Sequence, residues 1–371
     1  MKKSRDSTTF KESPFLVLKG FLMGSADIVP GVSGGTMALI LGIYERLLNA
    51  IKSVNGPFLK SFFTFKWKTA FNELHLKFLV FLFTGIFGAL AFFTKVVPLQ
   101  VYMFTHPEIV FGLFFGLILG SIYILYKSLE RVRWVELLMS VVGIAIGLWV
   151  INLVPSDTPE NSAFVFLSGM ISICAMILPG ISGSYLLLIM RKYDYLLSNI
   201  GKIGGVETMD GIIGLLPFML GAVVGLSLFS RFLSWLLSKY HSQTISLLVG
   251  FLIGSLFVIW PFQHREFKEQ VRETIELDYT DTRVQELMEG EINENLPEYQ
   301  RIGKVLNPDA AFDELKRVEV ETVKKKMLKS DPYIPSLSEE DDTETNVFGG
   351  LIGVFIGILL VGGLDYLRDK T

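Results

Sequence analysis

The chain has only one cysteine, Cys174, and four histidines among its 371 residues. A single cysteine excludes an intrachain disulfide and thiolate-rich zinc or iron–sulfur sites, and the histidines are not clustered as metal ligands would be. The His-Glu-x-x-His, P-loop and Gly-x-Ser-x-Gly motifs are also missing. We therefore predict a protein that is not an enzyme, with no metal, no cofactor and no nucleic-acid partner.

Charged residues are scarce as well: they make up 19% of the chain, whereas 50% of it is hydrophobic. The mean hydropathy is +0.47, and a soluble domain of this length has more charge and shorter apolar runs. The first 13 residues contain no apolar core, so we expect no cleavable signal peptide. The sequence predicts an integral membrane protein. Apolar runs of about 20 residues, long enough to cross a bilayer, cover 78–98, 109–126, 135–154, 212–233, 244–261 and 347–367.

One unusual segment occurs twice. Residues 29–36, Val-Pro-Gly-Val-Ser-Gly-Gly-Thr, correspond to residues 178–185, Leu-Pro-Gly-Ile-Ser-Gly-Ser-Tyr. When residues 18–51 are aligned with 167–200, 14 of the 34 positions are identical. Apolar segments interrupted by glycine and proline in corresponding halves of a membrane protein indicate a transporter's binding site. The alternative is that these residues only kink packed membrane helices.

The apolar segments 14–28 and 36–51 beside the first loop are too short and too charged for full spans. They fit a re-entrant helical hairpin, in which two half-helices meet at a break inside the membrane. Three full spans follow each hairpin, and this odd number makes the second repeat enter from the opposite face. We predict that the breaks are formed by Pro30, Gly31, Pro179 and Gly180.

The predicted fold class is therefore all-α integral membrane, with two inverted-topology repeats, each a re-entrant helical hairpin plus three transmembrane helices. Basic residues gather before residue 14 and in the loop 52–77, which places both termini in the cytoplasm by the positive-inside rule. Residues 262–345 hold 22 of the 37 acidic residues and only 12 of the 34 basic ones. The predicted parts are membrane repeat 1 at 1–154, membrane repeat 2 at 155–261 plus 346–371, and an acidic extracytoplasmic insertion at 262–345 with helix-like patches at 267–277 and 310–328.

The repeated loops supply the candidate binding groups. A half-helix that begins after a Pro-Gly break presents free backbone N–H groups and the positive end of its dipole, which together attract an anion. We predict that a phosphate or carboxylate binds to the amides and hydroxyls of Ser33, Gly34, Gly35, Thr36, Ser182, Gly183 and Ser184. The alternative is that Ser33 and Ser182 are only helix N-caps.

Ionisable residues in apolar segments are further candidates. Arg46 and Arg191 can pair with an anionic head group through the planar guanidinium, or else reach the interface or pair with Glu45 or Asp194. Asp27, which aligns with Met176, and Glu45 are candidates for coupling transport to a proton or a sodium ion. Two repeated features are predicted to be structural. Tyr44 and Tyr193 would be interfacial anchors, and the glycines of Gly116-x-x-x-Gly120 and Gly250-x-x-x-Gly254 would pack helices closely.

Three segments carry a resemblance to a known family: Gly20 to Thr36 with the following Gly42-Ile43-Tyr44-Glu45, Pro179 to Ser184 with Tyr193, and Gly116 to Ser121. They resemble the signatures of the bacterial polyprenyl-phosphate transporters. The resemblance implies a multi-pass protein of the bacterial cytoplasmic membrane that translocates undecaprenyl phosphate, the carrier lipid recycled in cell-envelope synthesis, and binds its phosphate at the two loops. A secondary transporter or channel for a small anionic solute is the alternative function. Contacts of the insertion with envelope-synthesis proteins and assembly into a homo-oligomer are left open.

Overall fold

The computed structural model describes residues 8–28, 33–54, 58, 61, 64–67, 74–97, 99–129, 131–154, 158–159, 161–205, 207–290, 302–307, 317–335 and 346–368. Pro30 and Gly31, predicted to break the first hairpin, lie outside these residues. The chain divides into two compact units. The first comprises Met1–Ala91, Phe114–Ile259 and Ile356–Thr371, and the second Phe92–Leu113 and Trp260–Phe355.

The sequence repeat appears in the first unit as two sets of three helices with matching boundaries. Each boundary of the second set lies 149 residues after its counterpart in the first set. A serine, Ser33 or Ser182, stands directly before the short middle helix of each set. The helices of the first set are α1 (Ser13–Ile28), α2 (Gly34–Ile40) and α3 (Tyr44–Lys52), and those of the second are α10 (Ser162–Ile177), α11 (Gly183–Ile189) and α12 (Tyr193–Gly201).

The second arm of each predicted hairpin differs from the expectation. Residues 36–51 were expected to form one half-helix, but the structure divides them into α2 and α3. The division falls where the backbone turns left-handed, with φ of 67° at Gly42 and 49° at Arg191. A residue in this conformation commonly ends a helix, because it turns the chain out of the helical path.

Four helices among the described residues are long and apolar enough to cross a membrane. They are α6 (Leu76–Lys95), α8 (Pro107–Ser128), α9 (Trp134–Ile151) and α13 (Thr208–Lys239). The span predicted at 244–261 is shorter than expected, because its helix α14 (His241–Ser255) has 15 residues. Helices α7 (Leu99–Thr105) and α16 (Val347–Arg368) also lie outside the insertion.

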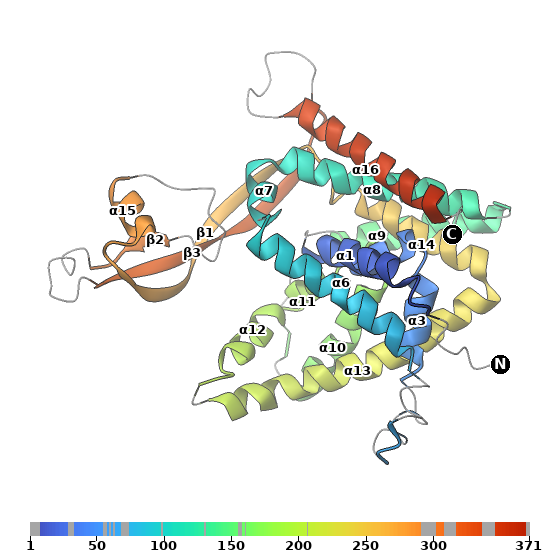
Figure 1. Cartoon of the computed structure of the whole chain (residues 1–371), viewed down its shortest axis with the longest axis horizontal. Coiled ribbons are helices and arrows are strands. Elements are labelled where there is room, and N and C mark those ends of the chain that lie inside the picture. The colour runs from blue at the N-terminus through green and yellow to red at the C-terminus, as the bar shows by residue number, and fades with distance from the viewer. Residues whose placement is uncertain are drawn as a thin grey trace. The chain divides into compact units, whose positions relative to one another are not determined.

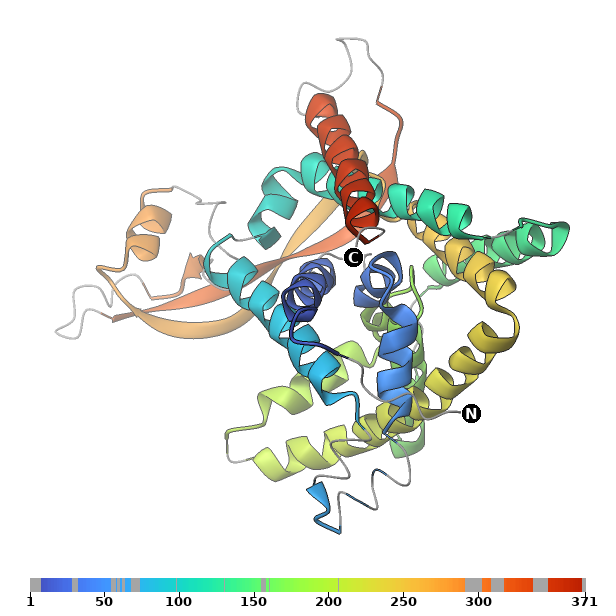
Figure 2. The same ribbon diagram turned by 45° about the vertical axis from the view of Figure 1, so that its right-hand side comes forward.

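Glycines let the first helix of each set lie against a long helix. A Cβ atom at Gly20 of α1 would collide with the backbone carbonyl of Leu82 in α6, and one at Gly169 of α10 with that of Phe218 in α13. Gly20 and Gly169 are themselves counterparts in the repeat. The pairing of α1 with α6, which Figure 2 shows side by side, therefore corresponds to that of α10 with α13.

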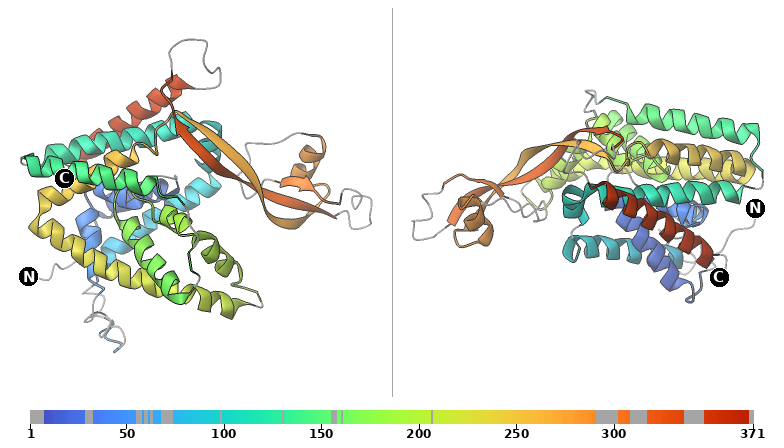
Figure 3. Two further views of the ribbon diagram at one scale, coloured as in Figure 1. Left: turned by 180° about the vertical axis from the view of Figure 1, so that it is seen from behind. Right: turned by 90° about the horizontal axis from the view of Figure 1, so that it is seen from above.

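The predicted packing role of the Gly-x-x-x-Gly glycines is confirmed for three of them. Gly250 of α14 faces Gly143 of α9 so closely that a Cβ atom added to Gly250 would lie 2.8 Å from the Gly143 Cα. Gly254 faces Gly147 in the same pair of helices. Figure 3 shows α9 and α14 running side by side. Gly120 of α8 faces Ile358 of α16.

The insertion contains a β-sheet, so the helix-like patches expected at 267–277 and 310–328 are wrong over the described residues 267–277 and 317–328. Strands β1 (Gln263–Asp278) and β3 (Arg317–Pro332) form a long antiparallel ribbon, and β2 (Ile302–Val305) pairs with the other edge of β3. Helix α15 (Thr282–Met288) lies with β2 near one end of this ribbon (Figure 1). Val318 and Val320 alternate with acidic residues at the strand period of two and pack on Val284 of α15.

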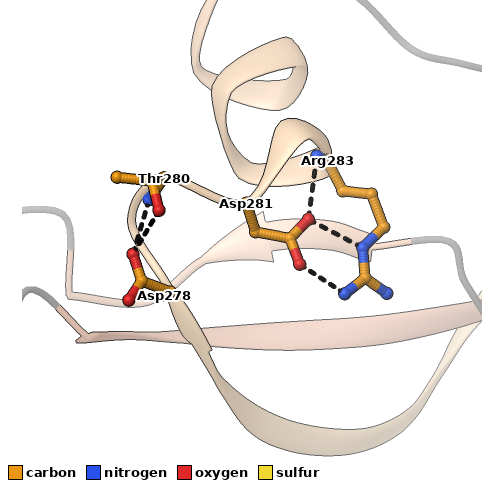
Figure 4. A network of polar contacts seen from close by, with 4 residues as sticks. All are labelled: Asp278, Thr280, Asp281 and Arg283. Atoms are coloured by element: carbon orange, nitrogen blue, oxygen red, sulfur yellow. Dashed lines mark hydrogen bonds and ion pairs between the residues drawn. The ribbon is translucent and has the colours of Figure 1, made fainter.

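A polar turn connects β1 to α15 (Figure 4). Asp278 accepts hydrogen bonds from the amide and the hydroxyl of Thr280, at 2.9 and 2.6 Å. Asp281 caps α15 by accepting the N–H of Arg283, and its two carboxylate oxygens accept two bonds from the guanidinium, at 2.9 and 2.6 Å. The hydrogen bonds from the Arg283 side chain lower the pKa of the Asp281 carboxyl below its usual value.

Candidate functional site

Each of the two signature loops leads into a short helix through a serine cap. The Ser33 hydroxyl accepts the N–H of Thr36 at 3.2 Å and lies 3.0 Å from the Thr36 hydroxyl. In the second loop the Ser182 hydroxyl accepts the N–H of Tyr185 at 3.4 Å and lies 2.9 Å from the Ser184 hydroxyl. Ser33 and Thr36 are buried, whereas Ser182 is half-buried and Ser184 is exposed. Both serines are therefore N-caps, and the second loop is the more accessible of the two.

The two signature loops contact each other within the first unit. The N–H of Gly180 donates to the Thr36 hydroxyl at 2.9 Å, and the hydroxyl of Tyr44 donates to the carbonyl of Ile177 at 3.0 Å. Gly35 passes so close to the end of α10 that a Cβ atom there would lie 2.7 Å from the Ile177 carbonyl oxygen. The structure thus brings together residues that are more than 130 positions apart in the sequence.

A carboxylate lies at the start of α2. Asp27, near the end of α1, accepts the N–H of Gly34 at 2.5 Å. A negative charge is favourable at this position because the first amides of a helix point toward it. Met176 occupies the corresponding position in the second repeat, so the two loops differ in charge. An anion bound at the first loop would have to share its amides with Asp27.

Arg46 and Arg191, the two arginines predicted to bind phosphate, lie in different surroundings. Arg46 donates to the Thr8 hydroxyl at 2.7 Å, pairs with Glu12 at 3.6 Å, and places its guanidinium 4.8 Å from the ring centre of Phe78. These contacts attach the N-terminal segment to α3. Arg191 is exposed in the turn between α11 and α12. Binding of phosphate by either arginine remains a prediction.

Glu45, the other coupling candidate, is the second residue of α3 and directly follows Tyr44. Its carboxylate lies 3.2 Å from Nε2 of His241, the first residue of α14, and both side chains are exposed. The pair joins the first helix set to the helix that faces α9. A coupling role for Glu45 remains a prediction.

Two lysines near the short helices were not singled out by the sequence. Lys19 of α1 donates to the carbonyl of Leu41, the C-cap of α2, at 2.9 Å. Lys192, which follows α11, is 1% exposed, and its ammonium donates to the Thr158 carbonyl at 3.3 Å. The ammonium also lies over the rings of Phe164 and Tyr195, at 5.7 and 5.8 Å. A cation beside the last carbonyls of a helix stabilises it through the helix dipole.

The position of Tyr44 differs from the predicted one at the membrane interface. The prediction of an interfacial anchor is wrong, because the side chain is 2% exposed and bonds to the opposite loop. The identity of Tyr44 and Tyr193 in the aligned repeats was the signal that could have indicated a shared role. For Lys192 the available signal was a charged residue inside an apolar segment, which is a candidate for a functional role.

Comparison with known proteins gives the family. The model of the undecaprenyl phosphate translocase-like family matches residues 23–276, a range that includes both signature loops. A polyprenyl-phosphate transporter of Vibrio cholerae is 40% identical over 246 residues, which are 66% of this chain and 77% of the relative. One of Staphylococcus aureus is 34% identical over 259 residues, which are 66% of this chain and 85% of the relative. No solved structure matches the chain. The chain therefore belongs to the undecaprenyl phosphate translocase-like family.

Proposed function

We propose that the protein moves a polyprenyl phosphate, undecaprenyl phosphate in the first place, across the bacterial cytoplasmic membrane, so that the carrier lipid is recycled for envelope synthesis. The observation that carries this proposal is the hydrogen bond between Thr36 and Gly180, which joins the two repeated loops of a chain in this family. The names of the two relatives supply the substrate class. The isoprenoid tail stays in the bilayer while the head group crosses.

The phosphate binds, in this proposal, where the two loops meet. Ser182 and Ser184 offer hydroxyls at the accessible loop, and Gly183 and Ser184 offer backbone amides at the start of α11. The buried Ser33-Gly34-Gly35-Thr36 segment completes the site from the other repeat, and Arg191 supplies a positive charge from the turn after α11. Hydroxyls, amides and a guanidinium are the donors that phosphate groups favour in proteins.

Asp27 couples transport to a cation in this scheme. Its carboxylate is bonded to the Gly34 amide, which a phosphate would also use. Two negative groups near one amide repel each other, and protonation of Asp27 or binding of a sodium ion removes the repulsion. Phosphate binding and cation binding would then favour each other.

The proposed topology is that of two inverted repeats with re-entrant hairpins, both termini in the cytoplasm and the insertion outside. The matching helix boundaries support the repeat, and the basic loops support the orientation. The helices of 7 and 9 residues that follow each signature loop are too short to cross a bilayer. They fit segments that enter and leave by the same face.

The test is transfer of a polyprenyl phosphate between the leaflets of proteoliposomes that contain the full-length protein. Head groups that reach the outer leaflet are measured by their cleavage with an added phosphatase that cannot enter. We expect faster transfer than in empty liposomes, and slower transfer when Ser33→Ala and Ser182→Ala are combined. Ser238→Ala is the matched control, because this exposed hydroxyl bonds only to the carbonyl of Trp235 among the described residues.

Transfer no faster than in empty liposomes would contradict the proposed function. Normal transfer by the Ser33 and Ser182 double variant would contradict the proposed site. The same liposomes, loaded with labelled inorganic phosphate, test the small-anion alternative. Flux of the free ion without lipid transfer would favour that alternative.

A further inference from the structure

Two identical tyrosines occupy equivalent positions in the repeats but make different contacts. Tyr44 is the first residue of α3, and Tyr193 is the first residue of α12. The Tyr44 hydroxyl donates to the carbonyl of Ile177, the last residue of α10 in the other repeat. Tyr193 is half-buried, and its hydroxyl has no hydrogen-bond partner within the part of the chain that the structure describes. One of two equivalent donors is therefore used and the other is not.

The carbonyl that Tyr44 binds is one that needs a partner. The last carbonyls of a helix have no N–H group of their own helix to accept. Beyond Ile177 the chain continues through Pro179, which has no N–H to offer. A carbonyl without a partner is costly in apolar surroundings. The Tyr44 hydroxyl thus stabilises the end of α10 from the opposite repeat.

The same chemistry exists at the equivalent place in the first repeat. Ile28 is the counterpart of Ile177, ends α1 as Ile177 ends α10, and is also followed by a Pro-Gly pair at the second position. A bond from Tyr193 to the Ile28 carbonyl would be the repeat equivalent of the bond from Tyr44 to Ile177. The sequence thus provides two equivalent bonds, of which the structure contains one.

The second bond between the loops belongs to one repeat only. Thr36 accepts the N–H of Gly180, but its counterpart is Tyr185, whose hydroxyl donates to the carbonyl of Ile151 at 2.6 Å. The Thr36 bond therefore stabilises the arrangement in which Tyr44 binds Ile177. The second repeat has no equivalent bond that would stabilise an arrangement in which Tyr193 binds Ile28. This asymmetry gives the two arrangements different free energies.

We propose that Tyr44 and Tyr193 are alternating latches. The bond from Tyr44 to Ile177 holds the state described here, and a bond from Tyr193 to Ile28 holds a second state in which the two repeats have exchanged conformations. This inference rests on the proposed function, because inverted repeats that exchange conformations open a shared site to opposite membrane faces. Loss of one latch shifts the equilibrium toward the state held by the other.

The experiment measures the state of each tyrosine by fluorine NMR. 3-Fluorotyrosine is placed at position 44 or 193 of the full-length protein in lipid nanodiscs, without polyprenyl phosphate. We expect two resonances at each position, one from the bonded state and one from the released state. Tyr44→Phe should raise the bonded fraction at position 193, and Tyr193→Phe should raise it at position 44. Each change should be about threefold to tenfold in the ratio of states, the effect of one neutral hydrogen bond.

Two further variants separate the latch from a general loss of stability. Thr36→Val removes the bond from Gly180, together with the local contact to the Ser33 hydroxyl, and leaves the Tyr44 bond in place. It should shift position 193 in the same direction as Tyr44→Phe. Tyr195→Phe is the control: its hydroxyl donates to the carbonyl of Gly214 within the second repeat, so both positions should keep their ratios.

The proposal is overturned if Tyr44→Phe leaves the bonded fraction at position 193 unchanged or lowers it, or if Tyr193→Phe does so at position 44. The NMR readout does not depend on transport, so the two proposals can fail separately. Reciprocal shifts without lipid transfer would contradict the proposed function but support the latches. Lipid transfer without reciprocal shifts would contradict the latches alone.

Discussion

At Gly35 the first signature loop passes close to the end of α10, so a substitution at this position tests the arrangement of the two loops. A Cβ atom there would lie 2.7 and 2.9 Å from the carbonyl oxygens of Ile177 and Met176. Gly35→Ala should therefore separate the loops, lower the free energy of unfolding by about 1–3 kcal/mol, and slow lipid transfer. Thermal unfolding and the proteoliposome assay check this.

Gly88 provides the control for this substitution. It lies in α6, and a Cβ atom there would have no neighbour within 4 Å. Since alanine favours a helix over glycine by about 1 kcal/mol, Gly88→Ala should raise stability and leave transfer unchanged. Unfolding of Gly35→Ala at the wild-type temperature would contradict the described contact.

Arg191 allows stability and activity to be separated. Its φ of 49° is a left-handed conformation that costs a side-chain-bearing residue about 1 kcal/mol, and glycine stands at the equivalent position 42. Arg191→Gly should therefore raise the unfolding temperature, whereas loss of the guanidinium should slow transfer if it binds phosphate. A more stable protein with normal transfer would exclude Arg191 from the site.

The sequence was sufficient to predict the residues of the loops but not all their contacts. The caps at Ser33 and Ser182 follow from local chain chemistry, because the acceptor and donor lie three residues apart. The burial of Tyr44 and Lys192 depends on segments that are distant in the chain, so no local pattern indicates it. The bond of Tyr44 joins residues 133 positions apart.

At the scale of elements, the helical parts were more predictable than the insertion. Small residues four apart in α14 correctly indicated close helix packing, but not that its partner is α9. The strands of the insertion were mistaken for helices, although Val318-Glu319-Val320 has the alternation that is typical of a strand. Pairing of β1 with β3, which lie nearly 40 residues apart, then decides the conformation. The breaks at Gly42 and Arg191 required backbone angles that residue types alone do not give.

The turn before α15 has a pH dependence with a definite sign. The pKa of Asp281 is lowered by Arg283, so its stabilising effect is complete above the ordinary value of 3.8 and is lost as the pH falls through the lowered pKa. Asp281→Ala removes the cap, worth about 1 kcal/mol, and should speed hydrogen exchange of α15 about fivefold in the intact protein at neutral pH. This difference from the wild type should shrink in acid.

Glu289→Gln is the control for this prediction, since Glu289 is an exposed residue at the C-cap of α15. Hydrogen exchange of α15 in the Glu289→Gln variant should follow that of the wild type at every pH. Equal exchange in wild type and Asp281→Ala at neutral pH would contradict the capping role.

At the scale of the whole molecule, the insertion can be removed without stretching the chain that it interrupts. Gln263 pairs with Pro332 at the base of the ribbon, and paired residues of antiparallel strands lie about 5 Å apart. Replacing residues 263–332 by a short glycine-serine linker should leave lipid transfer in proteoliposomes unchanged, because both signature loops lie outside the deleted segment. Loss of transfer by a folded deletion variant would assign the insertion a part in transport.

The unequal lengths of α13 and α14 have a consequence for the surrounding bilayer. α13 has 32 residues and α14 has 15, which correspond to about 48 and 22 Å at 1.5 Å per residue. They are joined by Tyr240 alone, and the hydrocarbon layer is about 30 Å thick. Most residues of α14 are buried, so neighbouring helices rather than lipids cover this short helix, whereas the longer α13 must tilt or protrude.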